Sequence, residues 1–516
     1  MRMRRLIALV WCGAQPLAGA GEAGKLPITL PPGPQLFLDD YLIERSTGIE
    51  RKVMSPPRFL DGPIVTGEPQ HQNWQAFLTV LHDPTAPNEK PFRMWYNADI
   101  VDDPTDGKYQ GRIGLLESTD GIHWPGPYRR LDSLAMDGRM QAGASVLDDG
   151  PNCPQSAERY KILFYDNDPR RGAGPRVAFS PDGVNWTLHN DGQLIVPKSA
   201  WNDIWTAFYD PLRRRYFYIA KEMEQHAWTN AEGRKLNFLI RRCRTGFSQD
   251  FKTWTPADGR VFSPDEKDSG ITQWYGAAGL HVRGDLMIGF LRVLRDDLTA
   301  EGTPKEAIEA NTSGSGGLGH HALGADGGAG MGYTGLTWTR DGETWQRDRD
   351  QDKFLEPDPK VGAWDHAMAW VSSAVPVGDE VYLYYAGFRW GHKFHHSTDR
   401  QIGLVKIKRD RYVARMAGAA GGQITTPVVT LESDQLTLNA DAAGGEIRVQ
   451  VCDADRKPLP GLTFADCRPV TSDSLAAEIQ WKGSLGSIKG QPVRLEFRLK
   501  NASLFAFEAG NEKESQ

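Results

Sequence analysis

The chain has 516 residues, with 60 Lys and Arg against 66 Asp and Glu, so its net charge is only −6. Because no basic run interrupts this balance, nothing suggests a nucleic-acid-binding protein. The 55 Gly, 33 Pro and 16 Trp, in a chain with few helical patterns, indicate turns and strands, and the length is too great for one ordinary domain.

The first twenty residues have the three parts of a secretory signal peptide. Residues 1–5 are basic, residues 6–12 are apolar, and residues 18–20 offer a small-residue cleavage site. We therefore expect residues 1–20 to be a signal peptide and the protein to be secreted or periplasmic. No other stretch approaches the ~20 apolar residues that a membrane-spanning helix needs, so no membrane span is expected.

One seven-residue motif occurs four times, as a Ser or Thr followed by Asp two positions later and by Trp four positions after that. Its copies occupy residues 118–124, 180–186, 248–254 and 339–345. This composition, with Gly after the Asp in three copies, is typical of a tight turn whose side chains bond their own backbone. The Asp residues lie 62, 68 and 91 positions apart, which is the spacing of propeller blades. The motif therefore predicts a repeat fold and has a structural role.

Short runs of β-branched and aromatic residues precede each motif, bounded by turn-forming residues, as in strands. They lie at residues 74–80, 92–96 and 112–116; 144–147, 160–165 and 176–179; 204–209, 216–219 and 237–240; 276–281, 286–291 and 332–336; and 370–375, 381–385 and 402–407, where the motif is missing. These five units predict an all-β chain with a five-bladed β-propeller over residues 35–418. A Gly-rich insertion at residues 299–330 explains the longest interval.

The residue pattern of the chain changes after residue 420. Runs at residues 428–431, 435–439, 446–451 and 493–499 alternate apolar and polar side chains, which indicates strands with one exposed face. We expect a separate β-sandwich domain over residues 421–512. Cys452 and Cys467 lie 15 positions apart in it and could form a disulfide in an oxidising compartment.

The turn motifs, the five units, the export signal and the trailing sandwich together resemble the five-bladed propeller glycosidases, the invertase, levanase and arabinanase-like group. The stretch Leu36-Phe-Leu-Asp-Asp-Tyr-Leu-Ile43 is the most specific part of the resemblance, and the chain looks most like secreted relatives of glycoside hydrolase family 32. In such enzymes the pocket lies over the ring axis, at the starts of the innermost strands and just after the second strands.

Polar residues at those places are our candidates, because sugar hydroxyls need hydrogen-bonding partners and a sugar face stacks on Trp. The catalytic candidates are Asp99, Asp166, Asp168, Asp203, Glu222, Glu224 and Asp365. The substrate-binding candidates are Asn73, Trp74, Asn97, Arg292, Arg295, His366, Arg389 and Trp390.

Glycoside cleavage needs two carboxyl groups with opposite roles. The resemblance implies an acid in the third unit, hence Glu222 or Glu224, with Asp166 and Asp168 stabilising charge. It also implies an Asp nucleophile at the first strand of the first unit, where this chain has His71-Gln-Asn73-Trp74. Either that role passes to Asp99, Asp203 or Asp365, or the protein does not use that mechanism.

The leading hypothesis is a secreted glycoside hydrolase whose partner is its poly- or oligosaccharide substrate. A phosphate-dependent glycoside phosphorylase is one alternative, with Arg295, Arg389 and His366 holding phosphate. A non-catalytic carbohydrate-binding propeller is the other, favoured by the missing Asp in the first unit. No cofactor and no metal are expected, and the protein is expected to be a monomer.

Overall fold

The chain folds mostly into β-strands in a computed structural model, which confirms the expected all-β class. The structure describes residues 26–67, 77–85, 90–100, 110–138, 141–196, 203–305, 328–349, 352–392 and 400–510. The predicted signal peptide and most of the Gly-rich insertion lie outside these residues. Within them, no helix has both the length and the apolar character to cross a membrane. Short 3₁₀ helices occur at Asp132–Leu134, Ser156–Glu158, His189–Gly192 and Leu485–Ile488.

Three groups of four antiparallel strands follow one another along the chain, each in sequential order. The first holds β5 (Leu78–His82), β6 (Phe92–Ile100), β7 (Gln110–Ser118) and β8 (Arg129–Arg130); the second holds β9 (Gln141–Asp148), β10 (Tyr160–Asp166), β11 (Gly174–Ser180) and β12 (Thr187–Leu188); the third holds β13 (Trp205–Asp210), β14 (Arg215–Thr229), β15 (Lys235–Ser248) and β16 (Thr255–Phe262). The strand runs predicted from the sequence overlap these elements where the structure describes them.

Two further groups complete the larger body. The fourth holds β17 (Thr272–Arg283), β18 (Leu286–Arg295), β19 (Met331–Thr339) and β20 (Gln346–Arg347), and the fifth holds β21 (Met368–Val377), β22 (Glu380–Phe388) and β23 (Arg400–Lys408). They meet at one parallel pair, Gly332 with Met368. Val65, which precedes the first group in sequence, pairs with Ile402 in β23, so the two ends of this body are joined.

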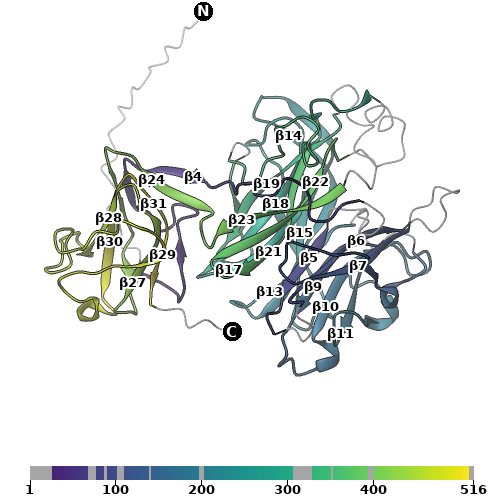
Figure 1. Cartoon of the computed structure of the whole chain (residues 1–516), viewed down its shortest axis with the longest axis horizontal. Coiled ribbons are helices and arrows are strands. Elements are labelled where there is room, and N and C mark those ends of the chain that lie inside the picture. Colours follow the sequence, from purple (N-terminus) through teal and green to yellow (C-terminus); the bar gives the residue numbers. More distant parts are fainter. Residues whose placement is uncertain are drawn as a thin grey trace, which may run out of the picture.

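The first strands of the five groups contact one another in a closed order, β5 to β9, β13, β17, β21 and back to β5. Hydroxyl side chains link neighbours in this ring. Thr79 Oγ1 donates to the Ala144 carbonyl at 2.8 Å, and the Val80 N–H donates to Ser373 Oγ at 3.0 Å. Figure 1 shows these five strands in the interior of the larger body. The prediction of five blades stays a prediction, and this ring supports it.

The turn motif behaves as predicted. In the first copy the Gly121 N–H donates to Ser118 Oγ at 2.9 Å, and the Ile122 and His123 N–H groups donate to Asp120 Oδ1 at 2.8 Å. Trp124 is buried. The motif is thus a self-bonded turn that anchors an aromatic ring.

The third copy of the motif departs from the other three at the residue after Asp. Gly121, Gly183 and Gly342 have φ between +73° and +76°, and Phe251 takes the same left-handed conformation at φ +62°. Left-handed backbone is unfavourable for a side chain as large as Phe. The buried ring of Phe251 packs on Trp254 at 5.3 Å, and this packing offsets the strain.

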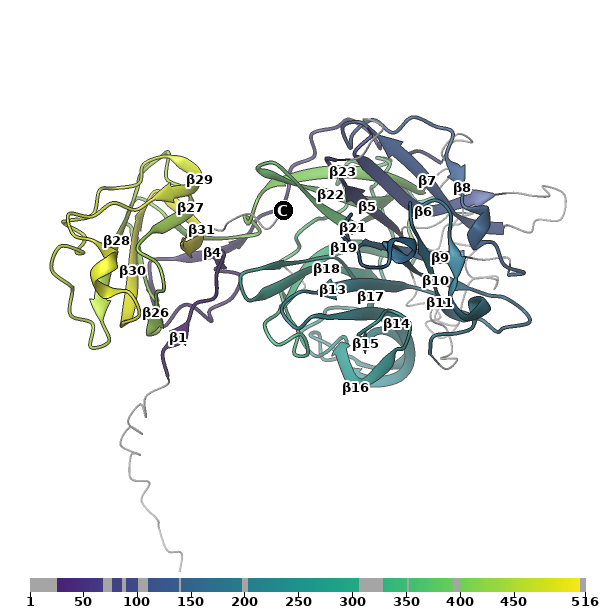
Figure 2. The same ribbon diagram turned by 90° about the horizontal axis from the view of Figure 1, so that it is seen from below.

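A second body consists of two six-stranded sheets. Its C-terminal strands are β24 (Val413–Ala417), β25 (Gly422–Thr425), β26 (Val429–Thr430), β27 (Leu436–Asp441), β28 (Glu446–Asp453), β29 (Asp473–Glu478), β30 (Pro492–Lys500) and β31 (Ala502–Ala509). Its N-terminal strands are β1 (Ile28–Thr29), β2 (Gln35–Leu36), β3 (Arg45–Thr47) and β4 (Glu50–Val53). Figure 2 shows β1 and β4, in purple, among the yellow strands of this body.

The N-terminal strands belong to a different body from the one that the expected domain boundary at residue 35 implied. We expected residues 35–53 to open the propeller, whereas β4 pairs with β24, β3 with β25 and β2 with β31. Strand pairing with a distant segment leaves no local sequence signal, which is why the boundary misplaced them. The possible disulfide is also wrong, because Cys452 and Cys467 are free thiols.

Candidate active site

The predicted carboxylates lie at the end of the ring opposite the motif turns. In the second group Asp166 pairs with Gln141 and Gly174, while Tyr160, at the other end of the same strand, pairs with the motif residue Ser180. The starts of inner strands and the ends of second strands therefore share one end.

A cluster of polar residues surrounds Tyr275 at this end. We call it the axial cluster, and its members are Asp203, Lys221, Arg241, Gln273, Tyr275 and Asp296. The Lys221 Nζ lies 5.2 Å from the centroid of the Tyr275 ring, and the Arg241 guanidinium carbon lies 4.9 Å from it. Lys221 forms an ion pair with Asp203. The cluster thus joins residues of the third and fourth strand groups.

A hydrogen-bond chain fixes the inner side of the axial cluster. Arg241 Nη1 donates to Gln273 Oε1 at 2.6 Å, and Gln273 Nε2 donates to Asp296 Oδ2. All three side chains are buried. Buried polar groups in such a network hold fixed positions, because any movement would leave one of them unpaired.

Burial sets the protonation properties of this cluster. It lowers the pKa of Lys221, an effect that Asp203 opposes, and it raises the pKa of the Tyr275 hydroxyl. That hydroxyl has no hydrogen-bond partner among the described residues. Asp203, in contrast, keeps 25% of its side chain exposed. The Asp203 side chain is therefore partly open to solvent, while Lys221 balances its charge.

Asp166, unlike Asp203, is a carboxyl group without solvent exposure. It is fully buried, and burial raises its pKa despite the opposing effects of Gln141 and Arg176. Both acids act on Tyr165. Burial, then Asp203 and then Asp166 raise the pKa of its hydroxyl to about 12. Burial thus raises the pKa of one of these carboxyl groups, and the other forms an ion pair with a cation.

The other predicted carboxylates whose side chains the structure describes are held by structural contacts. Burial acts to raise the pKa of Asp168, but the backbone N–H groups of Arg171 and Arg170 outweigh it and lower that pKa. Asp168 Oδ1 accepts these two bonds at 2.7 and 2.8 Å. This is a turn that bonds its own backbone.

Glu222 and Asp365 are each held by arginine. The Glu222 carboxylate lies 3.0 Å from both Arg242 and Arg244. Asp365 accepts bonds from Arg58 at 2.8 and 2.9 Å and from the Tyr385 hydroxyl at 2.9 Å. Arg58 belongs to the segment that connects the two bodies, so the Asp365 pair ties this segment to the fifth strand group.

Some substrate-binding candidates are engaged in contacts within the fold, and others lie nearer the surface. Asn97 Oδ1 accepts from the Gly143 N–H at 3.0 Å, and His366 contacts the carbonyls of Asp358 and Glu301. Arg292 is buried over the ring of Phe77, and burial lowers its pKa to about 10. These three side chains hold strand groups together and are not brought into the axial cluster.

Arg295, Arg389 and Trp390 lie nearer the surface. Arg295 donates to Asp297 at 2.9 and 3.0 Å, and the Arg389 guanidinium lies 5.9 Å from the Trp390 ring. Asn73 and Trp74 lie outside the described residues. Of Asp99 and Glu224 only the backbone is described, paired with Gly111 and Ile240.

The sequence reasoning missed Arg241 and Tyr275, although signals for both were present. Tyr275 follows Gln273 by two positions near the start of an inner strand, so the two share a face at a place where site residues were expected. Arg241 and Arg242 interrupt an apolar strand run with two charges, which indicates buried pairing. That strand is the third of its group, and only first and second strands were considered.

No family model and no curated protein matches this chain. Solved structures that resemble it include a glycosyl hydrolase from Bacteroides ovatus, at 14% identity over 73% of this chain and 98% of that one, with TM-score 0.42. A β-1,2-mannobiose phosphorylase from Listeria innocua has 12% identity over 70% and 97%, with TM-score 0.42. An N-acetylgalactosamine deacetylase from F. plautii has 14% identity over 70% and 96%, with TM-score 0.39. Similarities this distant assign neither a family nor a reaction to this chain.

Proposed function

We propose that the chain is an exported glycoside hydrolase that cleaves a poly- or oligosaccharide at the axial cluster. The observation that carries the proposal is a pair of carboxyl groups that both act on Tyr165: Asp166, whose pKa burial raises, and Asp203, which forms an ion pair with Lys221. Glycoside cleavage needs one protonated and one charged carboxyl group. In this proposal the acid lies in the second strand group and not in the third, where the resemblance put it.

In the proposed reaction the Asp166 carboxyl group donates its proton to the glycosidic oxygen as the bond to the leaving sugar breaks. The Asp203 carboxylate, ion-paired with Lys221, attacks the anomeric carbon or takes a proton from the attacking water. Asp166 is covered in this structure: a Cβ built on Gly138 would lie 2.0 Å from Asp166 Oδ1. The proposal therefore requires the segment at Gly138 to move when substrate binds.

Phosphorolysis is the second candidate function, and the cations of the axial cluster favour it. Lys221 and Arg241 both face the Tyr275 ring, and both are buried. Buried cations can replace the hydration shell of a phosphate. In this second mechanism phosphate would attack in place of water and would be held by Lys221 and Arg241. Of the phosphate ligands suggested by the sequence, Arg295 is paired with Asp297 and His366 contacts two carbonyls.

We also propose the architecture behind this site. The five strand groups would form a five-bladed β-propeller, and the two six-stranded sheets would form a β-sandwich that includes residues 28–53 as well as the C-terminal strands. Export through residues 1–20 completes the proposal. The closed order of inner-strand contacts supports the first statement.

A screen of purified protein against aryl glycosides and polysaccharides tests the function, run with and without inorganic phosphate. Asp203→Asn and Asp166→Asn are the test variants, and Glu117→Gln, an exposed acid at the motif end, is the matched control. Hydrolysis lost in both test variants and kept in the control supports the proposal. A strict phosphate requirement supports phosphorolysis. If nothing is cleaved and a sugar still raises the melting temperature, the protein is a binding propeller.

A further inference from the structure

A pocket of roughly 470 Å³ opens beside the axial cluster and has no part in the proposed reaction. We call it the side pocket. Arg295, the last residue of β18, lines it, while the next residue, Asp296, bonds Gln273 in the axial cluster. Successive strand residues point to opposite sides, so the two sites flank the same strand end. A ligand long enough to cover that strand end would reach both sites.

The side pocket carries surplus positive charge. Four cations line it, Lys267, Arg295, Arg349 and Lys353, and no Asp or Glu is among its described lining residues. Arg295 is neutralised by Asp297, and Lys353 by Glu356 at 2.8 Å. Lys267 and Arg349 form no ion pair within the described part of the chain. Two positive charges therefore remain available to a ligand.

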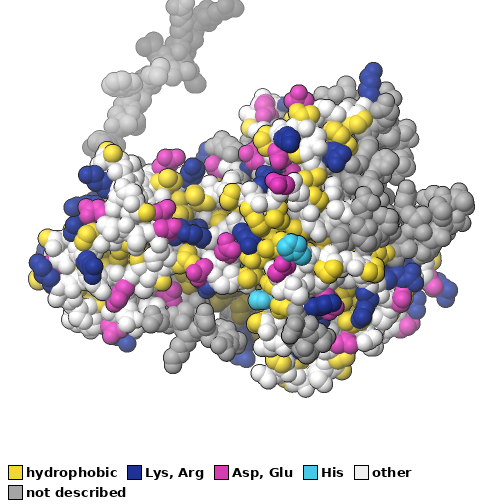
Figure 3. Space-filling model, viewed as in Figure 1, with side chains coloured by type: hydrophobic (Ala, Val, Ile, Leu, Met, Phe, Trp, Pro, Cys, Tyr) yellow, Lys and Arg dark blue, Asp and Glu magenta, His cyan; other side chains and the backbone are white. Residues whose placement is uncertain are grey.

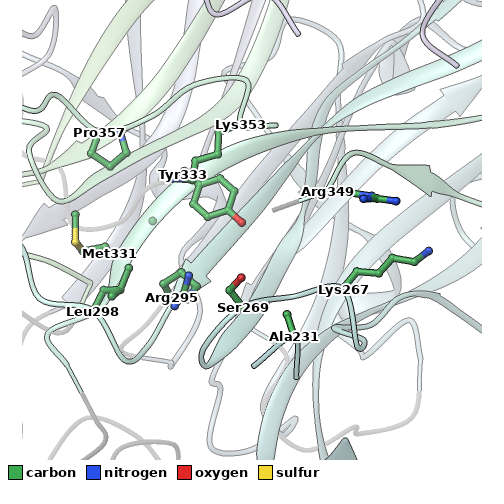
Figure 4. Close-up of a pocket in the computed structure, with 11 residues that line it drawn as sticks. Ala231, Lys267, Ser269, Arg295, Leu298, Met331, Tyr333, Arg349, Lys353 and Pro357 are labelled. Atoms are coloured by element: carbon green, nitrogen blue, oxygen red, sulfur yellow. The ribbon is translucent and has the colours of Figure 1, made fainter. Parts of the chain in front are cut away.

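The shape of the side pocket is two-sided. Figure 4 shows Lys267 and Arg349 together on one side and Leu298 and Met331 on the other, with the Tyr333 ring between them. A second hollow of roughly 250 Å³ also borders Lys267 and Arg349. Two aspartates line it as well, and each is paired with another arginine, Asp265 with Arg347 and Asp348 with Arg51. Because these two cations stand between two hollows, they suit a chain that runs through both more than a single small ion.

On the face drawn in Figure 3, Lys and Arg side chains are interspersed with Asp and Glu. Long-range attraction of acidic molecules to that face is therefore weak, and a local arrangement of unpaired cations stands out.

We propose that the side pocket binds a negatively charged unit, a uronate or a sulfate ester, of the polysaccharide whose chain continues into the axial cluster. This inference rests on the proposed function, because it specifies the substrate of the same site. Lys267 and Arg349 would contact the acidic group, Tyr333 would form the floor, and the apolar side would take a ring face.

Binding measurements by calorimetry test this proposal, with the protein carrying Asp203→Asn so that the ligand stays intact. The probes are a galacturonate hexamer, its neutral methyl ester, a sulfated galactose hexamer and its unsulfated form, and inorganic sulfate alone. The test variant is Lys267→Ala with Arg349→Ala. The control is Lys457→Ala with Lys489→Ala, which removes two exposed charges from the second body.

We expect at least one acidic hexamer to bind more tightly than its neutral form, and the test variant to weaken this binding by about tenfold or more. The control pair should leave it unchanged. Which hexamer binds identifies uronate or sulfate. Equal binding of acidic and neutral forms, full binding by the test variant, or inorganic sulfate binding as tightly as the hexamers would each overturn the proposal.

Failure of the catalytic proposal can be distinguished from failure of the side-pocket proposal. If Asp203→Asn still cleaves glycosides while the Lys267 and Arg349 variant loses acidic binding, the side pocket stands and the assignment of Asp203 falls. If Asp203→Asn abolishes cleavage and the pocket variant binds normally, the reverse holds.

Discussion

The two ends of the ring use aspartate in opposite ways. At the motif end Asp120 accepts bonds from the N–H groups of Ile122 and His123, two and three positions away, and these bonds with that of the His123 side chain hold its pKa below the usual range although burial opposes them. At the axial end Asp203 forms an ion pair with Lys221, and burial raises the pKa of Asp166, so both depend on residues brought together by folding. Local bonding makes a stable turn, whereas non-local packing sets the surroundings of the axial carboxyl groups.

The largest effect should come from breaking the axial end. Asp203→Asn should lower the rate of glycoside cleavage by about 10² to 10⁴-fold, because it removes the charged carboxylate of the pair. Asp182→Asn, the same change in the second turn motif, should leave that rate unchanged. Steady-state kinetics on both proteins measure the contrast, and equal loss of activity in the two would erase the distinction between the ends.

A second change breaks the motif end. Phe251→Ala should lower the free energy of unfolding by about 3 to 5 kcal/mol, since it removes a buried ring packed on Trp254 and Tyr216. Urea denaturation gives the value, and KM should not change. Phe251→Gly is the companion variant, which relieves the positive φ; we expect packing to dominate, so a Gly variant as stable as the native protein would contradict this weighting.

A third prediction concerns the junction between the two bodies. Burial raises the pKa of Asp348 from 3.8 to about 6, although its ion pair with Arg51 at 2.6 Å opposes this. A raised folded-state pKa means that this group's stabilising contribution is present below pH 3.8 and is lost as pH rises through about 6. Relative to Asp348→Asn, the native protein should lose roughly 2 kcal/mol of stability between pH 4 and pH 7. Urea unfolding at the two pH values checks this, and a difference that does not vary with pH would refute it.

The smallest effect should come from one turn bond. Ser118→Ala removes the acceptor for the Gly121 N–H and should cost about 1 kcal/mol in unfolding free energy, with no change in activity. Ser484→Ala, which removes a similar turn acceptor in the second body, is a matched control for the size of the effect. A loss of activity in Ser118→Ala would show that the two ends are coupled.

The contrast also explains what the sequence could predict. The turn motif depends on residues within six positions, so its bonds, its buried Trp and the strands around it were predictable from local pattern. Strand ends followed from the same repeats, which placed Asp166 and Asp203 correctly along the chain.

Partners brought from other strands or from distant segments were not predictable. Nothing near Glu222 in sequence indicates Arg242, and nothing near Asp365 indicates Arg58, 307 positions away. The pairing of residues 28–53 with the C-terminal sheets is hidden for the same reason. The acid expected in the third group therefore gave way, in our proposal, to one whose burial only the fold reveals.

The most direct test of the central claim compares leaving groups. A dinitrophenyl glycoside departs without protonation, whereas an alkyl glycoside of the same sugar needs a proton donor. We predict that Asp166→Asn keeps most activity on the former and loses it on the latter, and that Asp203→Asn loses both. If Asp166→Asn loses both equally, or keeps both, Asp166 is not the proton donor and the proposed pair of carboxyl groups is wrong.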